Sequence, residues 1–125
     1  MSPNKVRILV VDDEEDVRDL MQTVLAAEGY TVELAQDGAE AIERLGEHTY
    51  DVILSDMRMP RLGGLELLRE VRDHYPRTEV VLVTGYANAE TTVETQRMGA
   101  FGCLMKPFEL ADLLAMIQRA SPPAT

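Results

Sequence analysis

The feature that most constrains the fold of this chain is a regular alternation of short apolar runs with longer amphipathic stretches. The apolar runs hold five or six residues, many of them β-branched, and are too short to be helices. We expect five strands from these runs, at residues 6–11, 30–35, 51–56, 80–84 and 100–105. Such alternation implies a parallel sheet with helices on both faces, joined by right-handed crossovers. The chain is therefore predicted to be an α/β protein with a doubly wound five-stranded sheet.

The second and fifth runs differ from the other three. Residues 30–35 alternate between polar and apolar side chains, which suits a half-covered edge strand, and Gly102 interrupts the fifth run. Both runs therefore fit the edges of the sheet better than its centre. We expect the strand order 2-1-3-4-5, which is that of the flavodoxin-like (βα)5 fold.

A helical pattern follows each predicted strand. Apolar residues recur at helical spacing in four of the five intervals, at residues 17–25, 39–45, 65–71 and 110–117. Glycine is common just after a helix, so the first two helices are expected to stop at Gly29 and Gly46. The fourth helix, expected over residues 88–98, carries three threonines, each costing roughly half a kcal/mol relative to alanine. We expect this helix to be the least stable.

Composition limits the classes of function. A chain of 125 residues is the size of one domain, and its net charge of −10 argues against direct binding to nucleic acid or to an anionic membrane. No apolar run approaches the ~18 residues needed to cross a bilayer, and the start of the chain lacks the pattern of a signal peptide. The single cysteine, Cys103, suits a reducing cytoplasm. We expect a cytoplasmic domain over residues 1–120, with a linker-like tail at 121–125 that favours an excised part of a larger protein.

Polar residues stand at the ends of the predicted strands. Asp12 and Asp13 follow the first strand, and Asp56 ends the third. Thr84 ends the fourth strand, and Lys106 follows the fifth. In an open parallel sheet, ligands bind beyond the carboxyl ends of the strands, near the point where the winding reverses. We therefore expect these five residues to converge, although they lie far apart in the sequence.

This set of residues favours phosphoryl transfer. Three neighbouring carboxylates repel one another unless protons or a cation hold them together. Oxygen ligands of this kind suit Mg²⁺. Asp56 could then act as a nucleophile, because aspartyl phosphates are an established covalent intermediate. Lys106 and Thr84 would supply a cation and a hydroxyl donor to the charge that develops on the phosphoryl oxygens.

Each of these residues also has an ordinary structural explanation. The acids of residues 12–16 could simply favour the start of a helix through its dipole. Asp56 could be a turn residue, Thr84 a strand end and Lys106 a solvated charge. The functional interpretation depends on the conjunction of all of them at the ends of otherwise apolar strands.

Four motifs resemble those of the response regulator receiver family, and they occur in the order found in that family. The motifs are Val10–Glu14, Asp56–Pro60 followed by Gly64 and Leu65, Thr84–Tyr86, and Lys106–Phe108. The resemblance extends from about Lys5 to Arg119. Residues 84–108 are most similar to receivers of the nitrogen-regulation class of transcription activators.

The resemblance implies a chemical role for each acid. A phosphoryl group would pass from a phosphohistidine on a partner histidine kinase to Asp56. Asp13, Asp56 and the backbone carbonyl of Arg58 would ligate Mg²⁺ directly, while Asp12 would act through water. The chain would be a signalling module that catalyses at most its own phosphorylation and dephosphorylation.

The resemblance also implies how the signal leaves the domain. Thr84 and Lys106 would contact the phosphoryl oxygens, and the bond from Lys106 to Pro107 is usually cis in this family. The fourth helix, fifth strand and fifth helix would bind an output domain or target protein, or a second copy after phosphorylation. The family usually has Tyr or Phe three residues before the lysine, where the ring moves inward on activation. Here that residue is Cys103, so Tyr86 is the nearest aromatic residue that could replace the moving ring.

Three other functions fit the sequence less well. A Mg²⁺-dependent aspartyl phosphatase or phosphotransferase would want a second acid where Arg58 stands, and a substrate cap for which there is no room. A flavin-binding module would want a phosphate loop rich in Ser, Thr and Gly, where residues 12–16 are all acidic. A phosphorylation-independent interaction module would not need the complete set of acceptor, acids, threonine and lysine.

Overall fold

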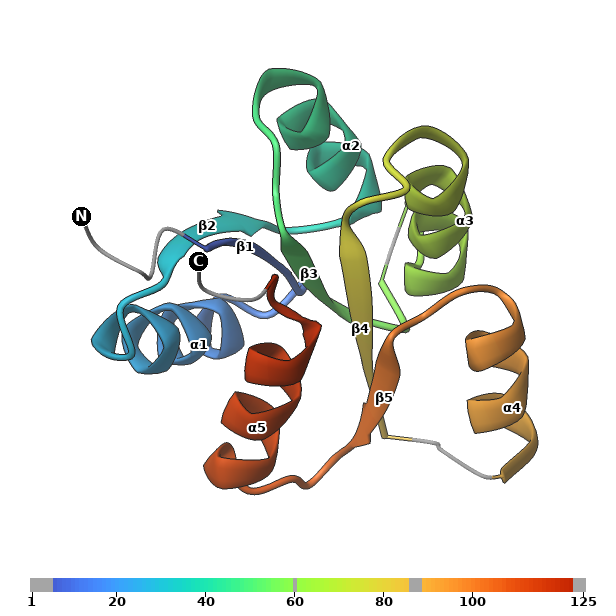
Figure 1. The fold of residues 1–125 in the computed structure, drawn as a ribbon. Helices are drawn as coiled ribbons and strands as arrows, with labels where there is room; N and C mark the ends of the chain where they lie inside the picture. Colours follow the sequence, from blue (N-terminus) through green and yellow to red (C-terminus); the bar gives the residue numbers. More distant parts are fainter. Residues whose placement is uncertain (1–5, 60, 86–88, 123–125) are drawn as a thin grey trace.

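One parallel sheet with helices on both faces makes up the computed structural model, which describes residues 6–59, 61–85 and 89–122. The strands follow the order β2-β1-β3-β4-β5 (Figure 1), so the predicted fold and strand order are confirmed. The strands are β1 (Arg7–Val11), β2 (Thr31–Ala35), β3 (Val52–Asp56), β4 (Glu79–Thr84) and β5 (Gly102–Met105). The helices are α1 (Glu15–Ala27), α2 (Gly38–Glu47), α3 (Gly64–His74), α4 (Ala89–Arg97) and α5 (Leu110–Ala120).

Strand β1 shows why both faces of the sheet are covered. Its side chains alternate between two core clusters, with Leu9 and Val11 in one and Ile8 and Val10 in the other. The first cluster packs against α2 and α3, and the second against α1 and α5, which lie on opposite faces in Figure 1. All four side chains are almost fully buried. The unbroken apolar run is therefore explained by burial on both sides rather than by a helix.

Helices α1 and α4 end in the same way, each at a glycine in the left-handed region. Gly29 has a φ of 96° and Gly99 a φ of 99°. In both cases the N–H groups of the glycine and of the next residue donate to carbonyls of the last helical turn, as in the Schellman motif. The predicted stop at Gly46 was wrong, because α2 continues to Glu47. A Cβ at Gly46 would meet no atom within 4 Å, so this glycine occupies an ordinary exposed helical position.

A polar network lies toward the amino-terminal ends of the strands. Arg7 Nη1 lies 3.1 Å from Glu33 Oε2, and the Tyr50 hydroxyl donates to Glu33 Oε1 at 2.8 Å. Asp51 accepts a hydrogen bond from the backbone of Arg7, and Thr78 donates to the carbonyl of Tyr50. Burial and the neighbouring Glu33 raise the pKa of Tyr50, so its hydroxyl stays protonated as a donor. These contacts join the start of β1 and the middle of β2 to the residues just before β3 and β4.

The other predicted boundaries agree closely with the structure. Each strand begins and ends within two residues of its predicted limits. The start of the fourth helix was predicted at Asn88, which lies outside the described residues. Among the described residues, none of the helices combines the length and the apolar character needed to cross a bilayer.

Candidate functional site

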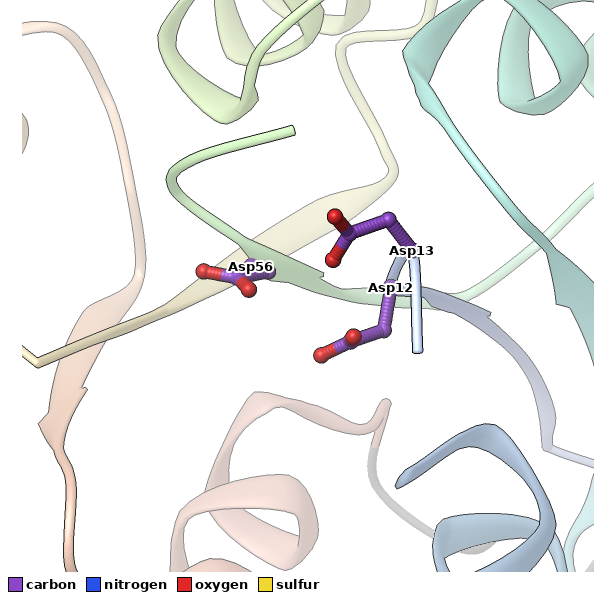
Figure 2. A group of neighbouring side chains, drawn as sticks. All are labelled: Asp12, Asp13 and Asp56. Atoms are coloured by element: carbon purple, nitrogen blue, oxygen red, sulfur yellow. The ribbon is translucent and has the colours of Figure 1, made fainter. Parts of the chain in front are cut away.

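Three aspartates meet at the carboxyl ends of β1 and β3. These strands are neighbours, so Asp12 and Asp13, which follow β1, come close to Asp56, the last residue of β3. One carboxylate oxygen from each lies within 4.8 Å of the others. Figure 2 shows the three groups gathered between the ends of the two strands. The predicted convergence of the acids is present in the structure.

Asp12 is the most buried of the three acids. Its side chain is only 4% exposed, and its Oδ1 accepts a hydrogen bond from the backbone N–H of Glu14 at 2.9 Å. Burial raises the pKa of Asp12 above its ordinary value of 3.8, and the negative charges of Asp56 and Asp13 raise it further. The hydrogen bond from Glu14 and the charge of Lys106 act in the opposite direction. A cation among these carboxylates would relieve their repulsion.

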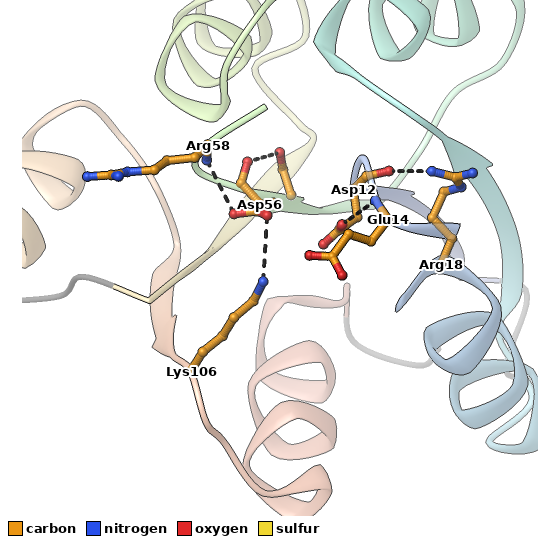
Figure 3. Close-up of polar contacts among 7 residues, drawn as sticks. Asp12, Glu14, Arg18, Asp56, Arg58 and Lys106 are labelled. Atoms are coloured by element: carbon orange, nitrogen blue, oxygen red, sulfur yellow. Dashed lines mark hydrogen bonds and ion pairs between the residues drawn. The ribbon is translucent and has the colours of Figure 1, made fainter. Parts of the chain in front are cut away.

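Both oxygens of Asp56 have a partner. The backbone N–H of Arg58 donates to Oδ1 at 3.2 Å, and Nζ of Lys106 lies 3.6 Å from Oδ2 (Figure 3). The next residue, Met57, donates its N–H to the carbonyl of Val83 on β4 at 2.9 Å. The Asp56 side chain is 13% exposed, so it is held in place and remains partly accessible to solvent.

Thr84 and Lys106 lie at the carboxyl ends of the neighbouring strands β4 and β5. Thr84 is the last residue of β4, and its carbonyl accepts a hydrogen bond from the backbone N–H of Lys106 at 2.8 Å. The bond between Lys106 and Pro107 is cis, as the family resemblance implied. The backbone of Lys106 is therefore tied to the end of β4, and its ammonium points toward Asp56.

The two residues expected in the switch region have different outcomes. Tyr86 lies outside the described residues. Cys103 is half-buried on β5, opposite Leu82 of β4 in register, and packs against the core cluster on the α2 and α3 side. Burial raises the pKa of its thiol. Cys103 is therefore part of the packing beside the site and contributes no group to the acidic pocket.

Arg18 is a site residue that the sequence prediction missed. Its Nη1 donates to the backbone carbonyl of Asp12 at 2.7 Å, from the first turns of α1 (Figure 3). This contact fixes the backbone that carries Asp12 and Asp13. Its partner is a backbone atom, so the only available signal was an arginine one turn inside the helix that follows the acids.

A small cavity lies beneath the acidic pocket. Asp12, Asp56 and Lys106 border it, and apolar side chains such as Val17 and Phe108 form its walls. Its volume of about 20 Å³ leaves room for roughly one water molecule. This cavity offers no space for an organic cofactor beneath the acids.

The chain matches the family described as the response regulator receiver domain over residues 8–118. It belongs to this family. The receiver domain is 44% identical over 114 residues to regulatory protein AtoC of Escherichia coli strain K12, covering 91% of the chain and 25% of AtoC. It is also 36% identical over 113 residues to the DNA-binding transcriptional regulator NtrC of the same strain, covering 90% of the chain and 24% of NtrC. These relatives confirm the predicted likeness to the nitrogen-regulation class, and the chain spans about a quarter of their length.

A solved receiver structure has the same fold. The response regulator protein TrrA from Thermotoga maritima, solved in complex with Mg(2+)-BeF, superposes with a TM-score of 0.83 and 30% identity, covering 92% of this chain and 98% of that one. Receiver domains are phosphoacceptor signalling modules of two-component systems, in which they pair with histidine kinases and output domains. The observed geometry can therefore be interpreted as that of a receiver.

Proposed function

We propose that Asp56 accepts a phosphoryl group from a phosphohistidine on a histidine kinase, with Mg²⁺ bound beside it. The observation that carries this proposal is the convergence of Asp12, Asp13 and Asp56 with Lys106 at one edge of the sheet. Family membership supports the same function, since receivers are phosphoacceptors.

The donor atoms in the pocket fit Mg²⁺. They are all oxygens, and burial together with mutual repulsion makes the ionised state of Asp12 unfavourable without a cation. Asp13, Asp56 and the carbonyl of Arg58 would hold the ion directly, with Asp12 acting through water. The TrrA structure, whose complex contains Mg(2+)-BeF, supports this assignment for a relative of the same fold. The bound ion would neutralise charge that spreads onto the phosphoryl oxygens.

The transfer step uses few protein groups. A carboxylate oxygen of Asp56 forms a bond to phosphorus as the bond between phosphorus and the donor histidine nitrogen breaks. The leaving imidazole keeps the electron pair and takes up a proton from solvent. Lys106 and Thr84 then contact the phosphoryl oxygens, which supplies positive charge and a hydroxyl donor where negative charge increases. The domain thus contributes to its own phosphorylation.

The proposed output face consists of α4, β5 and α5. Val93 on α4 and Met105 on β5 are large apolar side chains that are 46% and 57% exposed. A groove between β5 and α5 is lined in part by Cys103, Met105 and Met116. Exposed apolar surface of this kind favours a partner that covers it, either an output domain or target protein or a second copy after phosphorylation. An output domain that regulates transcription is supported by the relatives, of which this chain spans about a quarter.

The proposal includes a cytoplasmic location, which the single thiol suits.

Phosphorylation by a small donor tests the acceptor directly. Incubation with acetyl phosphate and Mg²⁺ should add one phosphoryl group, and alkali should remove it as it removes an acyl phosphate. The variant Asp56→Asn should gain none, whereas Asp73→Asn, which changes an exposed aspartate on α3, should behave as the unmodified chain. Stoichiometric labelling of Asp56→Asn on another residue would reject the assignment.

Thermal unfolding tests the metal separately. A ligand that binds only the native state raises the melting temperature, so millimolar Mg²⁺ should stabilise the unmodified domain. Asp13→Asn should weaken this response. An unchanged melting temperature at tens of millimolar Mg²⁺ would contradict the metal site.

A further inference from the structure

The loop that follows Asp56 contains an unusual backbone conformation. Arg61 has a φ of 71°, and it is the only residue other than glycine with a positive φ among those that the structure describes. This left-handed conformation is unfavourable for a residue with a Cβ. It persists only where surrounding contacts hold it, and such positions concentrate near functional sites. Contacts with other parts of the chain must therefore hold Arg61 in this conformation.

Arg61 pairs with an aspartate from a different part of the chain. Its Nη1 lies 3.4 Å from Oδ2 of Asp37, whose side chain is only 5% exposed. The other oxygen, Oδ1, accepts the backbone N–H of Glu40 at 2.8 Å and so caps the start of α2. The carboxylate of Asp37 is thus fixed in position before it meets the arginine.

A second contact lies beside the first. The backbone N–H of Gly38 donates to the carbonyl of Leu62 at 3.1 Å. The two segments approach so closely that a Cβ at Gly38 would overlap this carbonyl oxygen. Residues 37–38 therefore bind residues 61–62 by two adjacent contacts. We name this pair of contacts the α2–loop link.

The linked loop also carries one of the hydrogen-bond donors to Asp56. The N–H of Arg58 donates to Asp56, and the carbonyl of Met57 accepts the N–H of Gly64 at 3.1 Å. Arg58 and Arg61 are three residues apart, so a trans backbone allows at most about 11 Å between them. The position of Arg61 therefore limits where the backbone of Arg58 can lie.

We propose that Asp37 and Arg61 are positioning residues for Mg²⁺, because the α2–loop link sets where the carbonyl oxygen of Arg58 lies. Neither side chain need touch the ion. This inference rests on the proposed function, in which that carbonyl is one of the metal ligands. It assigns a role to two residues that lie outside the acidic pocket.

The charge of Arg61 allows a positioning role to be distinguished from a direct electrostatic effect on Mg²⁺ binding. Arg61 is a cation near an anionic site, so removing its charge should strengthen binding of Mg²⁺ if charge alone mattered. Loss of a positioning contact should weaken binding instead. Arg61→Gly is a suitable change, because glycine accepts a positive φ and so removes backbone strain together with the ion pair. Weaker Mg²⁺ binding by a variant of equal or greater thermal stability would identify positioning.

The experiment is a Mg²⁺ titration of the unphosphorylated domain, followed by amide chemical shifts. We expect Arg61→Gly to raise the Mg²⁺ dissociation constant by about tenfold, as removal of an outer-shell partner commonly does. Asp37→Asn should weaken binding similarly while keeping the helix cap, since asparagine also caps well. The double variant should bind no more weakly than either single variant, because both changes break the same link. Arg77→Gly, at an exposed turn before β4, removes an equal charge and should not weaken binding.

The possible outcomes distinguish failure of the proposed metal site from failure of the positioning role alone. If the unmodified domain binds no Mg²⁺, the proposed metal site fails, and this inference fails with it. If that domain binds Mg²⁺ and Arg61→Gly binds equally well or more tightly, only the positioning role is overturned. Additive losses in the double variant would show two independent effects and would also overturn the link. Melting temperatures in metal-free buffer, with that of Arg61→Gly unchanged or higher, exclude a loss of binding through unfolding.

Discussion

The ammonium of Lys106 lies 3.6 Å from Oδ2 of Asp56, although strand β4 separates the two strands that bring them there. Asp56 ends β3, and Lys106 directly follows β5. The backbone of Lys106 is tied to Thr84 at the end of β4, so the flexible part of this pair is the lysine side chain. A phosphoryl group on Asp56 would take over this ion pair, and Lys106 is therefore suited to detect phosphorylation.

Replacement of Lys106 should leave phosphorylation of Asp56 intact but weaken the conformational change that follows it. In Lys106→Ala the acceptor and the acids remain, so we expect Asp56 to be phosphorylated by acetyl phosphate. Loss of a hydrogen bond to a charged group costs ~1.5–3 kcal/mol, so the activated population should fall by about tenfold or more. Hydrogen exchange over residues 85–98, with and without beryllofluoride, measures this response. Arg69→Ala on the exposed face of α3 is the charge control, and equal responses in Lys106→Ala and this control would contradict the role.

The raised pKa of Asp12 predicts how stability depends on pH in metal-free buffer. The folded state binds the Asp12 proton more tightly than the unfolded state, whose carboxyl has the ordinary pKa of 3.8. This group therefore lowers stability as pH rises from about 3.8 through its folded pKa, and the loss remains at neutral pH. We expect Asp12→Asn to raise the melting temperature at pH 7 by a few degrees, or about 1 kcal/mol. The gain should shrink near pH 4.

The corresponding Asp73→Asn variant serves as the control for this pH series, since its carboxyl is exposed on α3. Scanning calorimetry with a chelator present gives the melting temperatures. A gain in Asp12→Asn that is as large at pH 4 as at pH 7 would show that ionisation of Asp12 is not its cause.

Two glycines of α2 should respond to alanine in opposite directions. A Cβ at Gly38 would overlap the carbonyl oxygen of Leu62, whereas a Cβ at Gly46 would meet nothing within 4 Å. We expect Gly38→Ala to destabilise the fold by ~1–3 kcal/mol, the usual range for overpacking. Gly46→Ala should stabilise it by roughly 0.5–1 kcal/mol through helix propensity. Urea unfolding measures both values, and a neutral Gly38→Ala would show that the loop yields easily.

The surroundings of the Cys103 thiol should change little on activation. A small, half-buried side chain has less to rearrange than the aromatic ring usual in this family, and burial raises the pKa of the thiol in the resting state. We expect its alkylation rate to change by less than about twofold with beryllofluoride, while hydrogen exchange over residues 85–98 changes strongly. The urea-unfolded chain gives the reference rate for an accessible thiol. A large change at Cys103 without a change in α4 would make β5 the moving element.

The fold and the principal site residues could be predicted because parallel strands bring their carboxyl ends to one edge. Asp12, Asp56 and Lys106 needed only correct strand limits to be placed together. Gly46 shows where such prediction fails. Gly29 and Gly46 both follow an apolar stripe, but only Gly29 has a positive φ, and the sequence contains no direct record of φ.

The supporting contacts could not be predicted for a related reason. Arg18 binds a backbone carbonyl, an acceptor that any residue offers. Arg61 meets Asp37 only because of the path that the loop takes after β3. Neither side chain stands in a pattern of spacing, so the contacts become visible only in three dimensions.

The polar network lies toward the amino-terminal ends of the strands, and the acidic pocket lies at their carboxyl ends. Substitutions in the network can therefore change folding stability without changing the groups that take part in phosphoryl transfer. A five-residue strand such as β3 is roughly 17 Å long, and Tyr50 and Thr78 lie at the end opposite Asp56. Substitutions such as Tyr50→Phe and Thr78→Val could therefore yield a series of domains with graded folding free energy and an unaltered acidic pocket. Such a series would show how much global stability the switch requires. A fluorophore attached near the exposed His48 could follow unfolding without obstructing a phosphodonor.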